Sequence, residues 1–251
     1  MPTSPPPPAG PEPPPATSSA PQPVVRLHDV SKIYDDGGLC VTAIKDICFD
    51  ILERRFAMIV GPSGSGKTTL LNLIGCIDTP TSGRIEVCGH AVGELSDNAL
   101  SDFRSRNIAF IFQNFNLSPV LTAYENVEYP LLLLNVPAPL RREQTMAMLR
   151  SVGLWDLRDH RPNQLSGGQK QRVAVARALV KKPTLVLADE PTANLDTHTG
   201  AEVIALMRGV QEEHRVSFVF STHDPQLISH ADETFAIRDG ELVEHRAEDR
   251  A

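Results

Sequence analysis

The segment that decides the fold reads Phe56-Ala57-Met58-Ile59-Val60-Gly61-Pro62-Ser63-Gly64-Ser65-Gly66-Lys67-Thr68-Thr69. Its apolar start predicts a buried strand, and the rest fits the pattern G-x-x-x-x-G-K-[ST] at the beginning of a helix. In that pattern the loop amides and the helix start converge on phosphate oxygens. Lys67 reaches the β- and γ-phosphates, and the hydroxyl of Thr68 serves a Mg²⁺ ion. The segment therefore predicts a nucleoside-triphosphate site with residues Gly61 to Thr69 as its phosphate loop.

A second apolar run ends in two acids. Thr184 to Ala188 is followed at once by Asp189 and Glu190. A carboxylate at the end of a buried strand suits the metal-holding acid of a nucleoside triphosphatase, so we expect Asp189 to serve Mg²⁺ through water. Glu190 is placed to accept a proton from water that attacks the γ-phosphate. Together the two segments indicate an enzyme that hydrolyses a nucleoside triphosphate.

Short β-rich runs alternate with helical patterns along most of the chain. Two of the runs, Thr184 to Ala188 and Val216 to Phe220, are almost wholly apolar, as strands are when helices cover both faces of a parallel sheet. The expected fold class is therefore α/β, with a mostly parallel core sheet and flanking helices. The predicted strands are residues 24–27, 44–49, 56–60, 84–87, 108–112, 184–188, 216–221 and 234–238, and the predicted helices follow Gly66, Ser96, Leu140, Gly167, Thr197 and Pro225.

Composition excludes several classes of protein. The chain has 251 residues, of which 41% are hydrophobic and 22% charged, which is ordinary for a globular protein. Its net charge of -7 argues against nucleic-acid binding by bulk charge, so no nucleic-acid partner is expected. The four cysteines lack the spacing of a metal or redox site. Because no apolar run approaches membrane-spanning length and the first residues lack a signal-peptide pattern, we expect that the chain does not cross a membrane by itself and that any membrane role would come from a partner.

The two ends of the chain differ from the rest. Eleven of the 21 prolines lie within residues 1–23, which contain no large apolar residue after Met1. We predict a disordered or polyproline-like tail there, because such a segment buries too little surface to offset its ordering entropy. The globular domain is expected at residues 24–246, and residues 247–251 are expected to form a short C-terminal tail.

A third motif narrows the class, and it reads Leu165-Ser166-Gly167-Gly168-Gln169. Ser166 can cap the helix that runs to about Val180, and the two glycines leave the first amides of that helix open to an anion. The chain thus carries two phosphate-binding helix ends but one phosphate loop. This combination suggests one nucleotide held between two chains.

With these motifs in this order, residues 24–244 resemble the ATP-binding cassette (ABC) ATPases. The resemblance implies a P-loop NTPase fold with an antiparallel β subdomain and a helical subdomain at about residues 114–163, extended by the start of the signature helix. It implies ATP and Mg²⁺, and a homodimer in which the signature loop (165–169) of one subunit closes on the ATP of the other. The remaining site residues follow from the same resemblance: Tyr34 stacks on adenine, Gln113 meets Mg²⁺ and takes part in catalysis, Asn194, Leu195 and Asp196 form the D-loop at the dimer interface, and His223 contacts the γ-phosphate.

A narrower resemblance is to the lipoprotein-release and macrolide-export branch of the family. It rests on the stretches Leu71–Asp78, Phe112–Leu117 and Leu121–Glu128. Since the chain ends at Ala251 with no membrane part, the resemblance implies a separate membrane permease, docked near Phe115 to Tyr124. It also implies a peripheral location on the cytoplasmic side of the inner membrane, and export or extraction of lipoproteins, peptides or drugs.

Two other functions are compatible with parts of this pattern. An ABC ATPase can transmit force to a cell-wall or signalling partner without transporting anything, and only the identity of the membrane partner separates this function from transport. A soluble nucleic-acid-associated ABC ATPase would carry a long coiled-coil insertion or two cassettes in one chain, and the sequence has neither. The substrate and the direction of transport are properties of the membrane subunit, so this sequence leaves them open.

Overall fold

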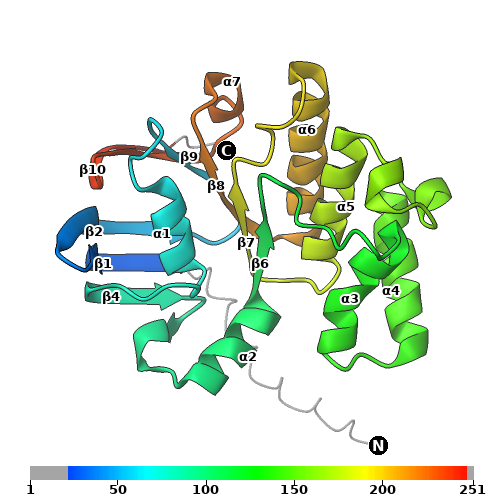
Figure 1. Cartoon of the computed structure of the whole chain (residues 1–251), viewed down its shortest axis with the longest axis horizontal. Helices are drawn as coiled ribbons and strands as arrows, with labels where there is room; N and C mark the ends of the chain where they lie inside the picture. Colours follow the sequence, from blue (N-terminus) through cyan, green and yellow to red (C-terminus); the bar gives the residue numbers. More distant parts are fainter. Residues whose placement is uncertain (1–21, 248–251) are drawn as a thin grey trace, which may run out of the picture.

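The computed structural model describes residues 22–247 of the chain (Figure 1). The predicted Pro-rich tail lies outside these residues apart from Gln22 and Pro23, and the predicted C-terminal tail lies outside them apart from Ala247. Within the described part, a mixed six-stranded sheet, a four-stranded sheet and a set of helices make up the fold. None of the described helices has the length and apolar character needed to cross a membrane.

The larger sheet has the strand order β10-β9-β3-β8-β7-β6. Its neighbours are parallel except for the edge pair β9 and β10, which is an antiparallel hairpin. Strands β7 and β8 are buried along nearly their whole length, which explains their continuous apolar sequences. The bounds are Phe56–Val60 (β3), Ile108–Ile111 (β6), Leu185–Asp189 (β7), Ser217–Thr222 (β8), Glu233–Arg238 (β9) and Glu241–Ala247 (β10).

The smaller sheet is antiparallel, in the order β2-β1-β4-β5. Its strands are Pro23–Asp36 (β1), Leu39–Leu52 (β2), Ser82–Val87 (β4) and His90–Ala91 (β5). Helix α1 (Lys67–Ile74) lies between the two sheets, on the left side of Figure 1, and contacts β2 and β4 on one side and β7 and β8 on the other. Its leucines and Ile74 are buried in the core that the sheets share. The helix that follows the phosphate loop is therefore fixed from both sides.

Helices α5 (Gly167–Leu179) and α6 (Thr197–His214) cover the other face of the larger sheet, on the right in Figure 1. There, buried side chains of both helices pack with those of β7 and β8 in a second hydrophobic core. Helices α3 (Ala123–Leu133) and α4 (Ala138–Ser151) pack outside α5, and α3 begins with a capping box formed by Thr122 and Glu125. The remaining helical segments are α2 (Asp97–Asn107), α7 (Pro225–Ile228) and 3₁₀ turns at Val92–Glu94, Trp155–Leu157 and Pro162–Gln164.

The predicted α/β class and its mostly parallel core sheet are confirmed, and each predicted strand and helix has a counterpart in the structure. Some strands and helices differ in length or position from the predicted ones. Strands β1 and β2 are each 14 residues long, well beyond the short runs expected from apolar residues alone. Helix α4 begins before Leu140 rather than after it. Helix α3 and the edge strands β5 and β10 were absent from the predicted elements.

Candidate active site

One cavity of about 430 Å³ collects the phosphate loop and the polar ends of the parallel strands. The cavity forms where β3, β7 and β8 end side by side, so residues far apart in the sequence become neighbours. Among the predicted site residues, it is lined by Ser63, Gly64, Gly66, Lys67, Thr68, Thr69, Gln113, Asp189, Glu190 and His223. The structure thus gathers the phosphate loop, both acids, the glutamine and the histidine around one space.

The phosphate loop is held tightly against the two sheets. A Cβ atom on Gly61 would lie 2.2 Å from the carbonyl oxygen of Ile237, and one on Gly66, whose φ is +103°, would lie 2.5 Å from that of Ala43. These close approaches require glycine at both positions. The turn of the β9–β10 hairpin also braces the loop, because the amide of Gly240 donates to the carbonyl of Ser65 over 3.1 Å.

Lys67 is buried, and its ammonium lies within the loop. Its Nζ donates to the carbonyl oxygens of Gly61 and Pro62, each over 2.9 Å. An ammonium held by two neutral carbonyls can exchange them for anionic oxygens, which accept stronger hydrogen bonds from a charged donor. The lysine is therefore placed to bind a phosphate at the mouth of the loop.

A hydroxyl, a carboxylate and a second hydroxyl form a chain across the ends of α1, β7 and β8. The Oγ1 of Thr68 lies 3.1 and 3.2 Å from the two carboxylate oxygens of Asp189. Ser221, at the end of β8, donates a short hydrogen bond from its Oγ to Asp189. Hydroxyl and carboxylate oxygens are the hard ligands that Mg²⁺ takes, directly or through water. The donor set of Thr68 and Asp189 therefore fits a magnesium ion.

Glu190 and His223 form an ion pair or a hydrogen bond at the edge of the cavity. The Nδ1 of His223 lies 2.8 Å from the Glu190 carboxylate. Glu190 has a left-handed φ of +47°, and its amide donates to the carbonyl and the hydroxyl of Ser221 over 3.1 and 3.2 Å. Strained backbone of this kind persists where surrounding contacts hold it, and it turns the side chain out of the strand direction. The pair can accept a proton from water in the cavity and keep it near a phosphate.

The D-loop residues connect this site to the next helix. Asn194 donates from Nδ2 to the carbonyl of Gln113 over 2.9 Å and to the Oδ1 of Asn114 over 3.0 Å. Asp196 caps α6 through the hydroxyl and amide of Thr199, and these hydrogen bonds lower the pKa of the Asp196 carboxyl. Leu195 is half-buried against the helical core. Movement of the D-loop would therefore pull on Gln113 directly.

The signature residues form a compact helix start outside the cavity. Ser166 and Gln169 cap α5 reciprocally, with the Gln169 amide donating to Ser166 Oγ and the Ser166 amide to Gln169 Oε1. Leu165 is buried below them. None of the residues 165–169 is among those that line the cavity within the described chain. In a single copy of the chain, the two predicted anion sites are therefore separate.

Gly168→Ala should lower the free energy of unfolding by about 1–3 kcal/mol, the usual cost of overpacking. A Cβ atom at Gly168 would lie 2.4 Å from the Cγ2 of Thr199, and Thr199 is held because its hydroxyl and amide both bond Asp196. Thr199→Ser removes that methyl group and keeps the hydroxyl, so the double variant should recover most of the loss. Urea unfolding of the two single variants, the double variant and the wild type measures this. Equal stability of Gly168→Ala and wild type would contradict the contact.

Tyr34 is not among the residues that line the cavity. It pairs in register with Val41, which does line it, so the two side chains share one face of the smaller sheet. Its hydroxyl donates to Asp78 over 2.7 Å, and Lys32 lies over its ring at 4.8 Å. Partial burial, together with the Asp78 carboxylate, raises the pKa of the phenol. Stacking of this ring on a base stays a prediction.

Several residues at the site were not predicted as functional. The Ser221 hydroxyl contacts the Asp189 carboxylate and the backbone amide of Glu190, and the sequence signal for it was a hydroxyl at the end of an otherwise apolar strand. Arg177 donates to the carbonyls of Phe115 and Asn116 and so fixes the loop after Gln113. Residues 41–43 of β2 also line the cavity, and no sequence pattern marked them.

The geometry defines a P-loop NTPase, and comparison with known proteins specifies the family. The ABC transporter family matches residues 44–193 of the chain. An uncharacterized ABC transporter ATP-binding protein of Thermotoga maritima is 47% identical over 219 residues, which cover 87% of this chain and 93% of that protein. The macrolide export ATP-binding/permease protein MacB of Brucella melitensis is 43% identical over 221 residues, but the matched part is 34% of that longer protein.

Solved structures agree with these relatives. The dimeric structure of the ATP-binding cassette MJ0796 in a post-hydrolysis state, bound to ADP and Pi, has a TM-score of 0.82 and 40% identity, covering 89% of this chain and 98% of that one. The chain therefore belongs to the ABC transporter family, as one of its ATP-binding proteins.

Proposed function

We propose that this chain is the ATP-hydrolysing subunit of an ABC transporter and that it powers a membrane permease. The observation that carries the proposal is the cavity in which Lys67, Thr68, Asp189, Glu190 and His223 come together. Phosphate-binding, metal-holding and proton-accepting groups are the three elements that hydrolysis of ATP requires.

The residues at the cavity fit ATP with Mg²⁺. Lys67 would exchange its two carbonyl acceptors for oxygens of the β- and γ-phosphates, while the amides of Gly64 to Thr69 hold the remaining charge. Thr68, Asp189 and Gln113 would hold the Mg²⁺ ion, with Asp189 acting through water. When bound, the Mg²⁺ ion would neutralise the negative charge that develops on the phosphates.

Glu190 would act as the general base. Its carboxylate is next to His223 and within the same cavity as Lys67, so water between them could lose its proton to Glu190 as it attacks the γ-phosphate. His223 would orient the carboxylate and hold the γ-phosphate in the transition state. Tyr34 would contribute the stacking surface for adenine.

The signature loop would act on the ATP of a second copy. Its residues lie away from their own cavity, and the capped start of α5 offers amides to an anion. The solved dimers of MJ0796 support a homodimer of this kind. The D-loop, 194–196, would then lie at the interface, where its bond to Gln113 couples one site to the other.

The membrane half of the proposal draws on the relatives. The relative MacB is an ATP-binding/permease protein by name, and this chain matches 34% of its length. We propose that the permease docks on the segment Phe115 to Tyr124. This segment includes Val120, an apolar residue that is 72% exposed. The complex would sit on the cytoplasmic side of the inner membrane and export or extract lipoproteins, peptides or drugs.

Reconstitution tests this proposal. The purified chain should hydrolyse ATP only when Mg²⁺ is present. A tagged copy purified from detergent-solubilised membranes should co-purify with an integral membrane protein in a fixed stoichiometry. In proteoliposomes that pair should hydrolyse ATP faster than the chain alone and move a substrate. A pair that hydrolyses ATP without moving any lipoprotein, peptide or drug would favour force transmission instead.

A further inference from the structure

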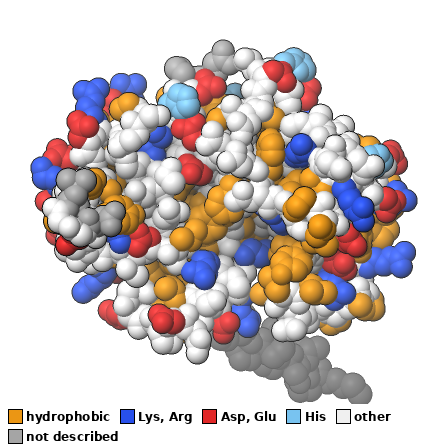
Figure 2. Space-filling model, in the orientation of Figure 1, with side chains coloured by type: hydrophobic (Ala, Val, Ile, Leu, Met, Phe, Trp, Pro, Cys, Tyr) orange, Lys and Arg blue, Asp and Glu red, His pale blue; other side chains and the backbone are white. Residues whose placement is uncertain are grey.

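A second group of polar side chains lies on the exposed face of the smaller sheet, apart from the active-site cavity. Among the side chains that the structure describes, His28, Asp29 and Cys48 form the one set of three histidine, cysteine or acidic residues whose donor atoms all lie within 4.8 Å of one another. All three are exposed, and none of them lines the active-site cavity. Charged side chains of both signs lie along the left edge of Figure 2, where Figure 1 places the smaller sheet.

A β-bulge in β1 brings the three residues together. Between residues 27 and 30, β1 contains one residue more than the facing part of β2, so His28 and Asp29 together stand opposite Cys48. Neighbouring side chains of a regular strand point to opposite faces, but His28 and Asp29 are both exposed between two buried residues. The left-handed φ of Asp29, +50°, accompanies this change of direction. The bulge therefore directs an imidazole and a carboxylate toward a thiol of the next strand.

The three side chains already meet through the Asp29 carboxylate. One carboxylate oxygen lies 3.0 Å from the Sγ of Cys48, and the other lies 2.9 Å from the Nδ1 of His28. The backbone amide of Asp29 also donates to the Cys48 sulfur over 3.0 Å. Ligand atoms around a tetrahedral Zn²⁺ ion lie about 3.3–3.8 Å apart, given metal–ligand distances of about 2.0–2.3 Å. A metal ion could therefore replace the protons in these contacts after small rotations of the side chains.

The backbone that carries the ligands is fixed by three strands. On β4, a Cβ atom at Gly83 would lie only 2.2 Å from the carbonyl oxygen of Asp29, so this strand packs closely against the bulge. On β2, Cys48 lies between two buried residues that anchor its backbone in the core. Sites built on strands keep their geometry better than sites on loops.

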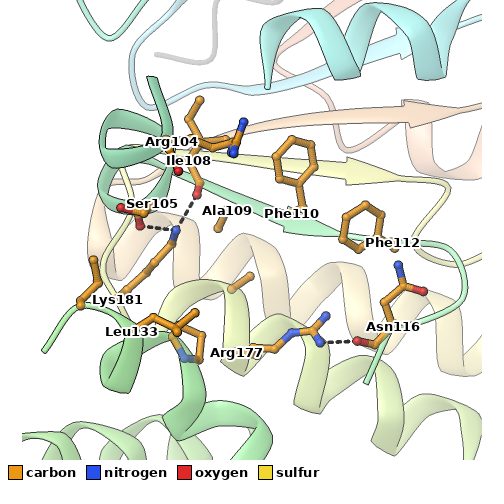
Figure 3. Close-up of a pocket in the computed structure, with 14 residues that line it drawn as sticks. Arg104, Ser105, Ile108, Ala109, Phe110, Phe112, Asn116, Leu133, Arg177 and Lys181 are labelled. Atoms are coloured by element: carbon orange, nitrogen blue, oxygen red, sulfur yellow. Dashed lines mark hydrogen bonds between the residues drawn. The ribbon is translucent and has the colours of Figure 1, made fainter. Parts of the chain in front are cut away.

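Another cavity, of about 390 Å³, shows how a polar cluster without metal ligands differs (Figure 3). None of the residues that line it is His, Cys, Asp or Glu. Its basic side chains bond backbone carbonyls instead, Lys181 to those of Ser105 and Ile108 and Arg177 to that of Asn116. These side chains hold segments of the fold together, whereas the cluster at the bulge presents ligand atoms to solvent.

The donor set selects the class of metal. Mg²⁺ and Ca²⁺ take oxygen ligands, so a thiol and an imidazole argue against them. Zn²⁺ and the neighbouring divalent transition ions bind cysteine sulfur, histidine nitrogen and aspartate oxygen. A carboxylate and a thiolate would together neutralise such a dication. Of the arginines on this face, Arg26 is paired with Asp50 and Glu86, and Arg84 lies on β4, across β1 from Cys48.

We propose that His28, Asp29 and Cys48 bind a divalent ion of the Zn²⁺ class, each through one ligand atom, with the fourth tetrahedral position open to water. Binding would release the thiol proton to solvent, and His28 would carry its remaining proton on Nε2. The thiolate would keep the hydrogen bond from the Asp29 amide, and such outer contacts stabilise metal ligands. The spacing of the cysteines gave no sign of this site, because only the pairing of β1 with β2 brings Cys48 to the other two ligands.

Cobalt(II) is the probe for this site, because a thiolate bound to Co²⁺ gives a charge-transfer absorption that oxygen ligands do not give. The full chain, reduced and stripped of metal with a chelator, should bind equimolar Co²⁺ and show this absorption. Zn²⁺ should displace the cobalt, abolish the absorption and raise the melting temperature, since a ligand that binds only the folded state stabilises it. The residues Thr68 and Asp189 offer oxygen ligands, so cobalt bound there would not show the absorption.

Variants of the ligands complete the test. Cys48→Ser should abolish the charge-transfer absorption. His28→Gln changes a side chain that is 74% exposed, so the fold should persist while Co²⁺ binding weakens by at least about tenfold. Cys40→Ser is the matched control, because Cys40 is an exposed cysteine on the same strand, and this variant should keep both the absorption and the affinity.

Three outcomes would overturn the proposal: a wild-type chain without the absorption, an absorption that survives Cys48→Ser, or unchanged affinity in His28→Gln. The three side chains would then serve only to stabilise the bulge. Hydrolysis of ATP with Mg²⁺ should be the same in all these variants and the wild type, because none of the three ligands lines the active-site cavity. Failure of the metal site therefore leaves the proposed function untouched, and the ATPase measurement reports on that function separately.

Discussion

Lys67→Ala should lower the affinity for ATP by about a hundredfold or more. Lys67 is the charged group of the phosphate loop, and in the structure it is buried with its ammonium 2.9 Å from two loop carbonyls. Hydrogen bonds to charged groups contribute about 1.5–3 kcal/mol each, so loss of the contacts to the β- and γ-phosphates removes most of the phosphate recognition. The loop amides would remain and would retain weak binding.

Thermal unfolding with and without ATP measures this loss. A ligand at a hundred times its dissociation constant stabilises a protein by about 2.7 kcal/mol, and a hundredfold weaker site should lose most of that gain at the same ATP concentration. Lys182→Ala, an exposed lysine away from the cavity, should keep the full ATP-dependent shift. An unchanged shift in Lys67→Ala would show that the nucleotide binds elsewhere.

The parts of the fold that the sequence predicts well are the buried ones. β7 and β8 are covered on both faces, so their sequences are continuously apolar and their type is unambiguous. The edge strand β10 lacks that signal, because it is mostly exposed and its sequence alternates poorly. Helix α3 contains Pro130 within its length, which obscures a helical pattern. The long strands β1 and β2 gain their extra length by pairing with each other, a contact no local pattern reveals.

The residues of the candidate active site also fall into those that a local sequence pattern predicts and those that only the three-dimensional arrangement reveals. Strand-end residues such as Asp189 and Glu190 could be predicted because the strand before them is evident and their chemistry is distinctive. Ser221 could not, since its importance depends on β8 lying next to β7, where its hydroxyl meets the Asp189 carboxylate and the Glu190 backbone amide. Arg177 likewise acts on a loop 61 residues away in sequence. Such contacts are set by the order of strands and helices in space, and a single sequence does not state that order.

Glu190→Gln should slow ATP hydrolysis by about 10²–10⁴-fold while ATP still binds. Glu190 is held beside His223 at the cavity edge by its left-handed backbone and by the bond from its backbone amide to Ser221. The side-chain amide of the introduced glutamine should therefore occupy the position of the carboxylate. The substitution keeps the shape of the side chain and removes the carboxylate that we propose as the proton acceptor, and general-base catalysis contributes about that factor. Single-turnover hydrolysis and the ATP-dependent thermal shift separate chemistry from binding. Glu202→Gln, a surface carboxylate on α6 paired with Arg172, should hydrolyse ATP at the wild-type rate.

The same variant should also trap the chain as a dimer. Replacing the carboxylate by an amide removes a negative charge beside the γ-phosphate, so the ATP-bound closed state should persist. In the proposed dimer, each closed site would take Lys67 from one copy and Ser166 from the other, in keeping with the position of Ser166 outside its own cavity. Size-exclusion chromatography with ATP should therefore give a dimer for Glu190→Gln, and adding Ser166→Arg should return it to a monomer by blocking the facing phosphate. A Glu190→Gln protein that stays monomeric at saturating ATP would rule out the shared site, and one with near-wild-type turnover would rule out Glu190 as the base.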